Sequence, residues 1–513
     1  MKLRLLICLV GLAALAAACG PKKIATVDPA IAARESLAKA DANLRAGCFD
    51  CLTEALKEYQ SVLGITAVTT DAGIGAMRAA ALLAMREREL GTTDSGYLET
   101  ARQLLSVLPQ MQADVSPLLQ IIGAFPWRAG AGRSGSVDSI VTNLYADRDQ
   151  RTETLRATAT RDELFAYMFI AYACESGTGL RLGNNEMRAA VGPMIDAPVV
   201  AYRLAICPTS GLERLDEVVA KEPRYKESAF YKGLNETSQR KLDEADARYR
   251  EAYEWRKTWP AATLAIANIA MSAEEFQLSR EFYDNTLALA PDFPDALLGK
   301  VRALTYLNRP EDAIAVSDRL LAISRYPGDA YYWKAYNELQ LEKLEPAWVD
   351  VEAADKLLIN SDVPKLAGII AIDRKQYDVA RSRLELSRQR NSMDCTTLYY
   401  LTLVQAELRM WADAARGAVS AAGCLTGAEV GLRAEIERLS GDAKLPEARK
   451  ARMIMSREQQ ILTATRMRAS CWYNGAVANY NLTMKDVAKD LASKIVDDEQ
   501  FGERAKQLIG LIR

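Results

Sequence analysis

The 513-residue sequence contains no histidine. This absence excludes Ser-His and Cys-His nucleophile pairs, imidazole acid–base catalysis and every metal site that needs an imidazole ligand. Carboxylate-only and Ser-Lys mechanisms stay chemically open, but no group of residues in the sequence indicates one. We therefore expect a protein that is not an enzyme, with no cofactor and no bound metal.

Neither sign of charge is in excess, since 65 basic residues stand against 67 acidic ones. A surface that binds nucleic acid through its phosphates is therefore not expected. Long apolar runs are also missing after the N-terminus, where no stretch reaches the roughly 18 residues that suggest a membrane-spanning helix. The body of the chain is expected to fold outside the membrane.

The N-terminus has the three parts of a secretory signal peptide. Residues 1–18 begin with two basic side chains, continue as an apolar run and end in small residues. The run Ala-Ala-Ala-Cys-Gly at 16–20 resembles the lipobox of bacterial lipoproteins, although its leucine stands one place further upstream than usual. The resemblance implies cleavage before Cys19 and a diacylglycerol thioether on its sulfur, usually with an added N-acyl chain. Gly20 then favours the outer membrane, facing the periplasm; an ordinary signal peptide is the alternative.

Small residues recur at nearly constant spacing between positions 225 and 426. The intervals are 34, 34, 34, 33 and 34 residues, along the series Ala245, Ser279, Ala313, Ala347, Ala380 and Ala414. Twelve positions before each stands a second residue, in the order Gly233, Ala267, Val301, Ala335, Gly368 and Thr402. Four of these six are glycine or alanine, and only Val301 and Thr402 are larger than alanine. A small residue on each of two antiparallel helices lets them cross closely, and a fixed period of this length indicates units that stack on one another.

This pattern resembles the tetratricopeptide repeat (TPR), whose small residues fall at repeat positions 8 and 20. Position 24 of that repeat is aromatic or large and apolar, as at Tyr249 and Tyr283. The resemblance implies an all-α, TPR-type α-solenoid of antiparallel helix hairpins, with six repeats over residues 225–426.

Outside the array the helical pattern continues without the period. A polar tether at 19–31 is followed by residues 32–224, which are expected to form an irregular region of divergent helical hairpins. Residues 427–513 are expected to hold C-terminal helices, a further TPR-like repeat and a capping helix. The residues that match repeat positions 4, 8 and 20 there are Trp472, Ala476 and Ala488.

Four cysteines are disulfide candidates in an exported chain. Cys48 and Cys51 lie at a helical turn, where a local disulfide is expected and a redox pair or half a zinc site are the alternatives. Cys174 and Cys207 each end an apolar segment and lie one repeat length apart, which favours a disulfide over two buried thiols. The sequence assigns no partner to the remaining ones: Cys395, Cys424 and Cys471.

By the resemblance, residues at repeat positions 5, 9, 12 and 13 of each first helix line the concave face of a TPR superhelix. Those residues include Phe230, Leu234, Asn268, Met271, Arg302, Tyr306, Tyr332, Tyr336, Tyr399 and Leu403. An aromatic and apolar face with scattered polar groups suits an extended peptide or an amphipathic helix. The alternative is that several of these tyrosines pack between repeats.

Two functions fit these features. The first is a non-enzymatic scaffold, tethered to the membrane by its lipid, that binds peptides or helices of other cell-envelope proteins. The second is a SusD-like lipoprotein that captures nutrients or glycans for an outer-membrane transporter. Proteins of that kind bury degenerate repeats under long insertions, whereas the six repeats of this sequence follow one another almost without insertion. We therefore favour the scaffold.

Overall fold

The computed structural model describes residues 28–92, 94–124, 148–174, 182–207, 213–324, 327–443 and 445–512. Cys19, the predicted signal peptide and nearly all of the predicted tether lie outside these residues. Two compact units divide the chain, one built mainly from residues before Glu227 and the other mainly from Glu227–Arg513. Every regular element of the described residues is helical, which confirms the predicted all-α class.

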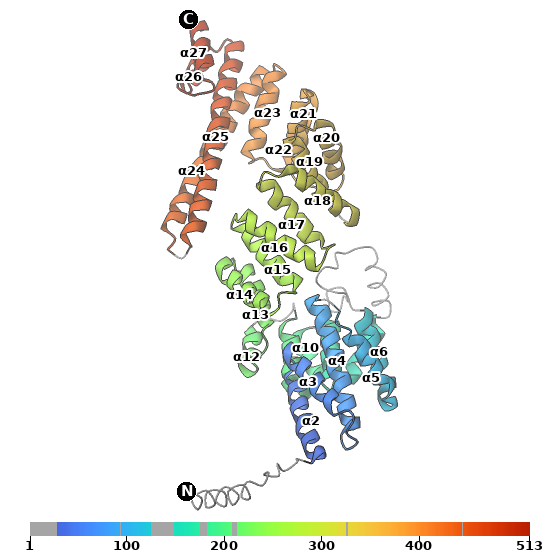
Figure 1. Ribbon diagram of the computed structural model, residues 1–513. Helices are drawn as coiled ribbons and strands as arrows, with labels where there is room; N and C mark the ends of the chain where they lie inside the picture. The colour runs from blue at the N-terminus through green and yellow to red at the C-terminus, as the bar shows by residue number, and fades with distance from the viewer. Residues whose placement is uncertain are drawn as a thin grey trace, which may run out of the picture. The chain divides into compact units, whose positions relative to one another are not determined.

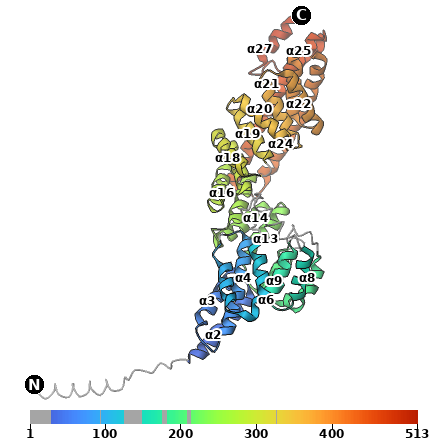
Figure 2. The ribbon, with the colours of Figure 1, turned by 90° about the vertical axis from the view of Figure 1, so that its right-hand side faces the viewer.

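The first unit is a set of helices of uneven length (Figure 2). They are α2 (Pro29–Ala46), α3 (Phe49–Val62), α4 (Thr69–Leu90), α5 (Tyr97–Ser106), α6 (Pro109–Ala124), α8 (Arg148–Thr158), α9 (Glu163–Ala173), α10 (Asn184–Val191), the 3-10 helix η1 (Gly192–Asp196), α11 (Pro198–Ala205) and α12 (Glu213–Lys221). Helix α2 begins and ends at residues that commonly cap helices. Asp28 caps it by accepting a hydrogen bond from the Ala30 amide, and Gly47 ends it at a φ of 67°.

Helix α9 lies at the core of this unit, as its apolar sequence predicts. All of its residues from Leu164 to Ala173 are buried. The structure joins Cys174, directly after α9, to Cys207, directly after the α11 segment, with 5.5 Å between their Cα atoms. The covalent link therefore connects the C-terminal ends of two neighbouring helices.

The second predicted cysteine pair closes the start of α3. Cys48 is the N-cap residue, and its sulfur accepts a hydrogen bond from the Cys51 amide at 3.0 Å. The structure joins the two by a disulfide, with 4.9 Å between the Cα atoms and both side chains fully buried. A third link, which the sequence did not assign, joins Cys395 to Cys424; Cys471 is a free, buried thiol.

The second unit is a stack of helix pairs in sequence order (Figure 1). The pairs are α13 (Ser228–Ser238) with α14 (Leu242–Trp255), α15 (Pro260–Ser272) with α16 (Phe276–Leu289), α17 (Pro294–Tyr306) with α18 (Pro310–Ile323), α19 (Gly328–Gln340) with α20 (Leu344–Asp355), α21 (Asp362–Asp373) with α22 (Tyr377–Arg390), α23 (Cys395–Glu407) with α24 (Trp411–Gly441), and α25 (Glu447–Asn481) with α26 (Lys485–Ser493); α27 (Gly502–Leu511) follows.

The small residues that recur at regular spacing in the sequence are the residues at which the paired helices cross. All six residues at repeat position 20 are completely buried, from Ala245 to Ala414. At position 8 of the fifth repeat, a Cβ added to Gly368 would lie 2.6 Å from Cγ of Leu384, which occupies position 24. A larger side chain at either crossing point would therefore push the paired helices apart.

Each pair turns through the same tight geometry. The residue five places before the position-20 residue has a positive φ, between 55° and 64°, and none of these residues is glycine: Arg240, Glu274, Asn308, Glu342, Lys375, Arg409 and Thr483. The next amide in every turn donates to the carbonyl five residues earlier, as Glu275 does to Ala270 at 2.8 Å. This is the Schellman ending of an α-helix, and its seventh occurrence at Thr483 places the predicted C-terminal repeat in the same register.

Helices α24 and α25 are much longer than the others, with 31 and 35 residues against 11 to 14 in the preceding pairs. The predicted boundary between 426 and 427 falls inside α24, which continues without a break from Trp411 to Gly441. An extra length of helix has therefore been added to the second helix of the sixth repeat and to the first helix of the seventh.

Candidate functional site

An aromatic cluster that includes the exposed Tyr306 and several half-buried rings lies on the middle repeats. The ring of Tyr306, at the end of α17, stacks on Phe276 with 4.7 Å between centroids and 15° between planes. Trp333 on α19 meets Tyr306 edge-on at 6.2 Å, and Tyr336 meets Trp333 at 5.9 Å. Arg302 places its guanidinium 5.8 Å from the centre of the Trp333 ring. The cluster therefore offers ring faces, ring edges and one cation to a ligand.

Only part of the predicted face is open to solvent. Tyr306 is 53% exposed and Leu234 is 45% exposed, while Arg302 and Asn268 are also exposed. The other predicted residues are half-buried: Phe230, Met271, Tyr332, Tyr336, Tyr399 and Leu403. Several of these side chains pack between repeats, whereas Tyr306 is open to solvent.

Phe230 and Tyr332 are two of the predicted groove residues that pack against neighbouring side chains. Phe230 lies 4.6 Å from Trp259 and 5.6 Å from Tyr249, measured between ring centroids. Burial raises the pKa of Tyr332 to about 12, with the neighbouring Asp362 carboxylate acting in the same direction. Its hydroxyl is therefore neutral at physiological pH and contributes mainly apolar surface.

Asn268 is the uncharged polar residue of the predicted face, and a hydrogen bond from a buried side chain fixes the orientation of its amide. The Tyr283 hydroxyl donates a hydrogen bond to Oδ1 of Asn268 at 2.7 Å. Because Tyr283 is itself buried, the amide nitrogen of Asn268 is the group left to face a ligand. Such an amide can donate to the backbone carbonyl of an extended peptide.

Tyr399 and Leu403 lie at the far end of the array, where the long helix α25 packs against α23. Tyr399 belongs to an apolar cluster with Leu398, Met467 and Trp472 around the buried Cys471. Burial raises the pKa of the Cys471 thiol to about 12, so the thiol is unreactive. Tyr399 therefore contributes to the packing of α25 against α23 more than to an open binding surface.

Trp333 and Phe276 are the members that the sequence analysis missed. Trp333 stands at repeat position 6, next to but outside the positions that define the groove by resemblance. Phe276 begins a second helix rather than a first one. Trp333 is one of many aromatic residues of the array that stand away from the crossing points, so its position alone did not single it out.

A buried charge cluster lies behind the face, between α19 and α20. The Lys334 ammonium is 3.2 Å from the Asp350 carboxylate and 4.0 Å from that of Glu338, and both carboxylates are buried. Burial, reinforced by Asp350, raises the pKa of Glu338 to about 7. A third carboxylate, that of the exposed Asp318 on α18, lies 2.9 Å from the same ammonium, so the cluster joins α18, α19 and α20.

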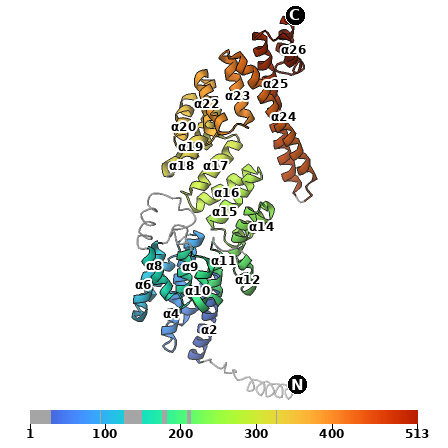
Figure 3. The ribbon, with the colours of Figure 1, turned by 180° about the vertical axis from the view of Figure 1, so that it is seen from behind.

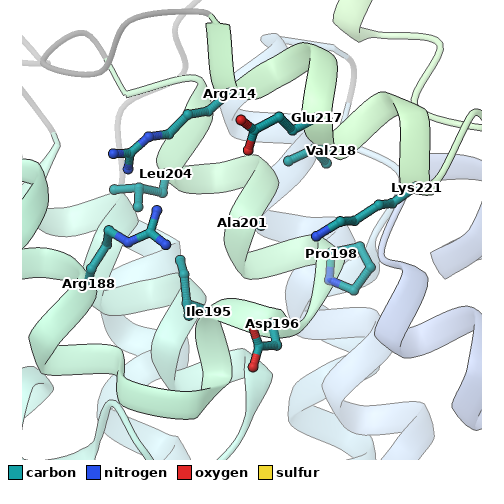
Figure 4. A pocket seen from close by; sticks show the side chains of 10 residues that line it. All are labelled: Arg188, Ile195, Asp196, Pro198, Ala201, Leu204, Arg214, Glu217, Val218 and Lys221. Carbon is teal, nitrogen blue, oxygen red and sulfur yellow. The ribbon is translucent and has the colours of Figure 1, made fainter.

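A small cavity lies in the first unit (Figure 4). Apolar residues such as Leu204 and Val218 line it together with the basic residues Arg188, Arg214 and Lys221 and two acidic residues. The volume is about 110 Å³, against roughly 300–1,000 Å³ for sites that bind organic ligands. It is too small for a nutrient or a glycan.

The described residues contain no group of three or more cysteine, aspartate or glutamate side chains placed to hold a metal ion. Within the same part of the chain, no helix combines the length and the apolar character needed to cross a bilayer.

Period, crossing residues and turns together decide the type of repeat. A helix pair of about 34 residues, small residues buried at two crossing points and a Schellman turn between the helices recur through the second unit. These are TPR-type repeats. The array is an α-solenoid in which each TPR unit packs on the next.

No protein-family model matches the sequence, and the search of curated proteins finds no match. Among solved structures, a TPR protein from Parabacteroides merdae is 14% identical over 56% of this chain and 98% of its own, with a TM-score of 0.34. Pseudomonas aeruginosa PilF is 19% identical over 38% of this chain and 89% of its own, with a TM-score of 0.35. The Cut9–Hcn1 hetero-tetramer is 12% identical over 95% of this chain and 96% of its own, with a TM-score of 0.38.

Proposed function

We propose that this protein is a non-enzymatic TPR scaffold that captures an extended peptide or a helix of another cell-envelope protein on its aromatic face. The observation that carries the proposal is the exposure of Tyr306 within the cluster of Phe276, Trp333 and Arg302. A ring that is half in solvent but already stacked on one side loses little conformational freedom when a partner covers the other side. Aromatic and arginine side chains of this kind dominate binding energy at protein interfaces.

The chemistry of the face favours a peptide over a sugar or a small metabolite. A cation above Trp333 and the free amide of Asn268 supply donors for backbone carbonyls, and the rings supply apolar contact. In the described part of the array, the helices from α13 to α23 follow one another with short connections, unlike the long insertions of SusD-like proteins.

The proposed location is the periplasmic face of the outer membrane, reached through a lipid on Cys19. Several acyl chains anchor a protein stably, because each buried methylene contributes about 0.8 kcal/mol. Cells fed an alkyne fatty acid should label the wild-type protein and not the Cys19→Ala variant. Label on the variant would contradict the anchor while leaving the binding face untouched.

The binding face is tested by affinity capture from detergent-solubilised envelope. Tyr306→Ala combined with Arg302→Ala should reduce the captured partner at least about tenfold, because two adjacent contact residues are lost. The control is Val349→Ala on α20, where an apolar residue that is also exposed (65%, against 53% for Tyr306) lies on the second helix of a pair. Equal capture by all three proteins would refute this face. Capture of glycans rather than proteins would favour the SusD-like alternative.

A further inference from the structure

The two long helices form a hairpin whose base is fixed to the last repeats. Residues Ala421, Leu425 and Cys471 are buried at this base together with α23 side chains, and the Cys395–Cys424 disulfide ties α24 to the start of α23. Beyond the base, the two helices pack mainly on each other. Figures 1 and 3 show the free end of the hairpin directed back toward α14.

Three arginines on one face of α25 join this free end to the beginning of the array. Arg449 pairs with Asp243 on α14 and, at 3.3 Å, with Glu275. Arg452 also pairs with Glu275, and Arg457 pairs with Glu274. A further pair at 3.2 Å, from Arg457 to Glu435 on α24, holds this arginine in place within the hairpin. Residues more than 170 positions apart are thereby brought into contact.

Four of the six side chains that join the hairpin to the array are shielded from solvent more than ordinary surface pairs, whereas those of Asp243 and Arg452 are 50% and 41% exposed. The side chains of Arg449 and Arg457 are 13% and 14% exposed, and those of Glu275 and Glu274 are 16% and 20% exposed. Partial burial reduces screening by water and salt, and shared partners make the group a network rather than isolated pairs.

The acidic partners Glu274 and Glu275 occupy two turn positions at which the repeat itself does not require an acidic residue. Glu274 occupies the positive-φ position of its turn, at 57°, which backbone geometry favours for glycine or asparagine. The same two turn positions in the six other repeats never hold two acidic residues; they read Arg240-Lys241, Asn308-Arg309, Glu342-Lys343, Lys375-Gln376, Arg409-Met410 and Thr483-Met484. The Glu-Glu turn therefore complements the hairpin arginines and not the fold of its own repeat.

We propose that the α24–α25 hairpin is an ionic latch that closes the array, holding its first two repeats to its sixth and seventh. Because the base of the hairpin is fixed, release comes from small rotations between successive repeats, which add up along a solenoid. High salt opens the latch, and so does an acidic segment that competes for the arginines. This device does not depend on which partner the aromatic face binds.

The test measures one distance inside the full-length protein. Nitroxide labels are attached to p-acetylphenylalanine at Ala247 on α14 and at Gly441 at the end of α24, so the native cysteines are not modified. Both positions are exposed, and a side chain added at Gly441 meets open space. Pulsed electron paramagnetic resonance then gives the distance distribution at about 0.02 M and about 1 M NaCl, where the screening length falls to about 3 Å.

Charge reversal shows whether these particular residues close the latch. Asp243→Arg with Glu275→Arg should shift the distribution to longer, broader distances at low salt. Adding Arg449→Glu and Arg452→Glu should restore the wild-type distance, because each reversed charge regains an opposite partner. Glu311→Arg with Glu342→Arg, an equal charge change on exposed residues elsewhere in the array, should leave it unchanged.

The wild type should shift to longer distances in 1 M NaCl and return on dilution. Circular dichroism accompanies each measurement to show that helix content is retained. A distance that changes neither with salt nor with the Asp243→Arg and Glu275→Arg substitutions would overturn the latch. A reversal that opens the hairpin but is not repaired by the fourfold swap would overturn the assigned pairing.

Discussion

Gly299 and Gly431 offer the same substitution in opposite surroundings. Gly299 lies inside α17, where an added Cβ would overlap the ring of Tyr283. Tyr283 is 2% exposed and its hydroxyl is held by Asn268, so the ring has no free space to enter. Gly431 lies inside α24, and an added Cβ there meets nothing within 4 Å.

The two effects that compete at these sites have known sizes. Gly→Ala in a helix interior stabilises by about 1 kcal/mol through backbone entropy. Overpacking a rigid core costs about 1–3 kcal/mol, and overlap with a buried aromatic ring belongs near the upper end. Gly299→Ala should therefore lower the free energy of unfolding by about 1–2 kcal/mol, while Gly431→Ala should raise it by about 0.5–1 kcal/mol.

Urea unfolding followed by circular dichroism measures both changes, and hydrogen exchange locates the first. Amides of α16 and α17 should exchange faster in Gly299→Ala, with little change in the first unit. A second-site test uses Tyr283→Leu, since leucine already fills this repeat position at Leu384. In that background Gly299→Ala should cost little or nothing. Equal stabilisation by both alanines in the wild type would refute the packing seen at Gly299.

Two further predictions concern the array. Ala380→Leu should destabilise the protein by about 1–3 kcal/mol, because Ala380 is completely buried at a helix crossing. Asp373→Ala, at an exposed position, should change the stability by about 0.5 kcal/mol or less. Thermal melts compare the two variants, and a larger loss of stability in Asp373→Ala would show that the register is wrong. The raised pKa of Glu338 means that the folded state holds its proton more tightly than the unfolded chain, so its contribution is full below pH 4.5 and is lost as pH rises through about 7. Glu338→Gln should match the wild type near pH 5 and exceed it in urea midpoint near pH 8, and parallel pH profiles for the two proteins would contradict this.

The sequence predicted those features that repeat. The crossing residues follow from the spacing, because close helix packing favours small side chains at fixed intervals, and the seventh repeat follows from the match of Trp472, Ala476 and Ala488 to TPR positions 4, 8 and 20. The burial of α9 follows from a helix that is apolar on all sides. The Cys174–Cys207 spacing of one repeat length also pointed to neighbouring helices, where the structure joins them.

Features that depend on distant residues could not be predicted in this way. Cys395 and Cys424 are 29 residues apart because one begins a helix and the other lies partway along the next, a spacing that matches no period. The length of α24 was missed because nothing in a helical pattern marks where a repeat ends and an extension begins. The partners of Arg449 lie more than 170 residues earlier, beyond the reach of any local rule.

The turn geometry has a consequence for how such an array diversifies. A non-glycine residue at positive φ costs about 1 kcal/mol or more, so glycine at any of the seven turns would be the more stable choice. The chain keeps instead Arg240, Glu274, Asn308, Glu342, Lys375, Arg409 and Thr483. Since the turn is closed by backbone hydrogen bonds, its side chain can change without altering the fold. The array therefore carries one such side chain per repeat at a fixed interval, and five of the seven are charged, so the charge at this position differs from repeat to repeat without any change of backbone.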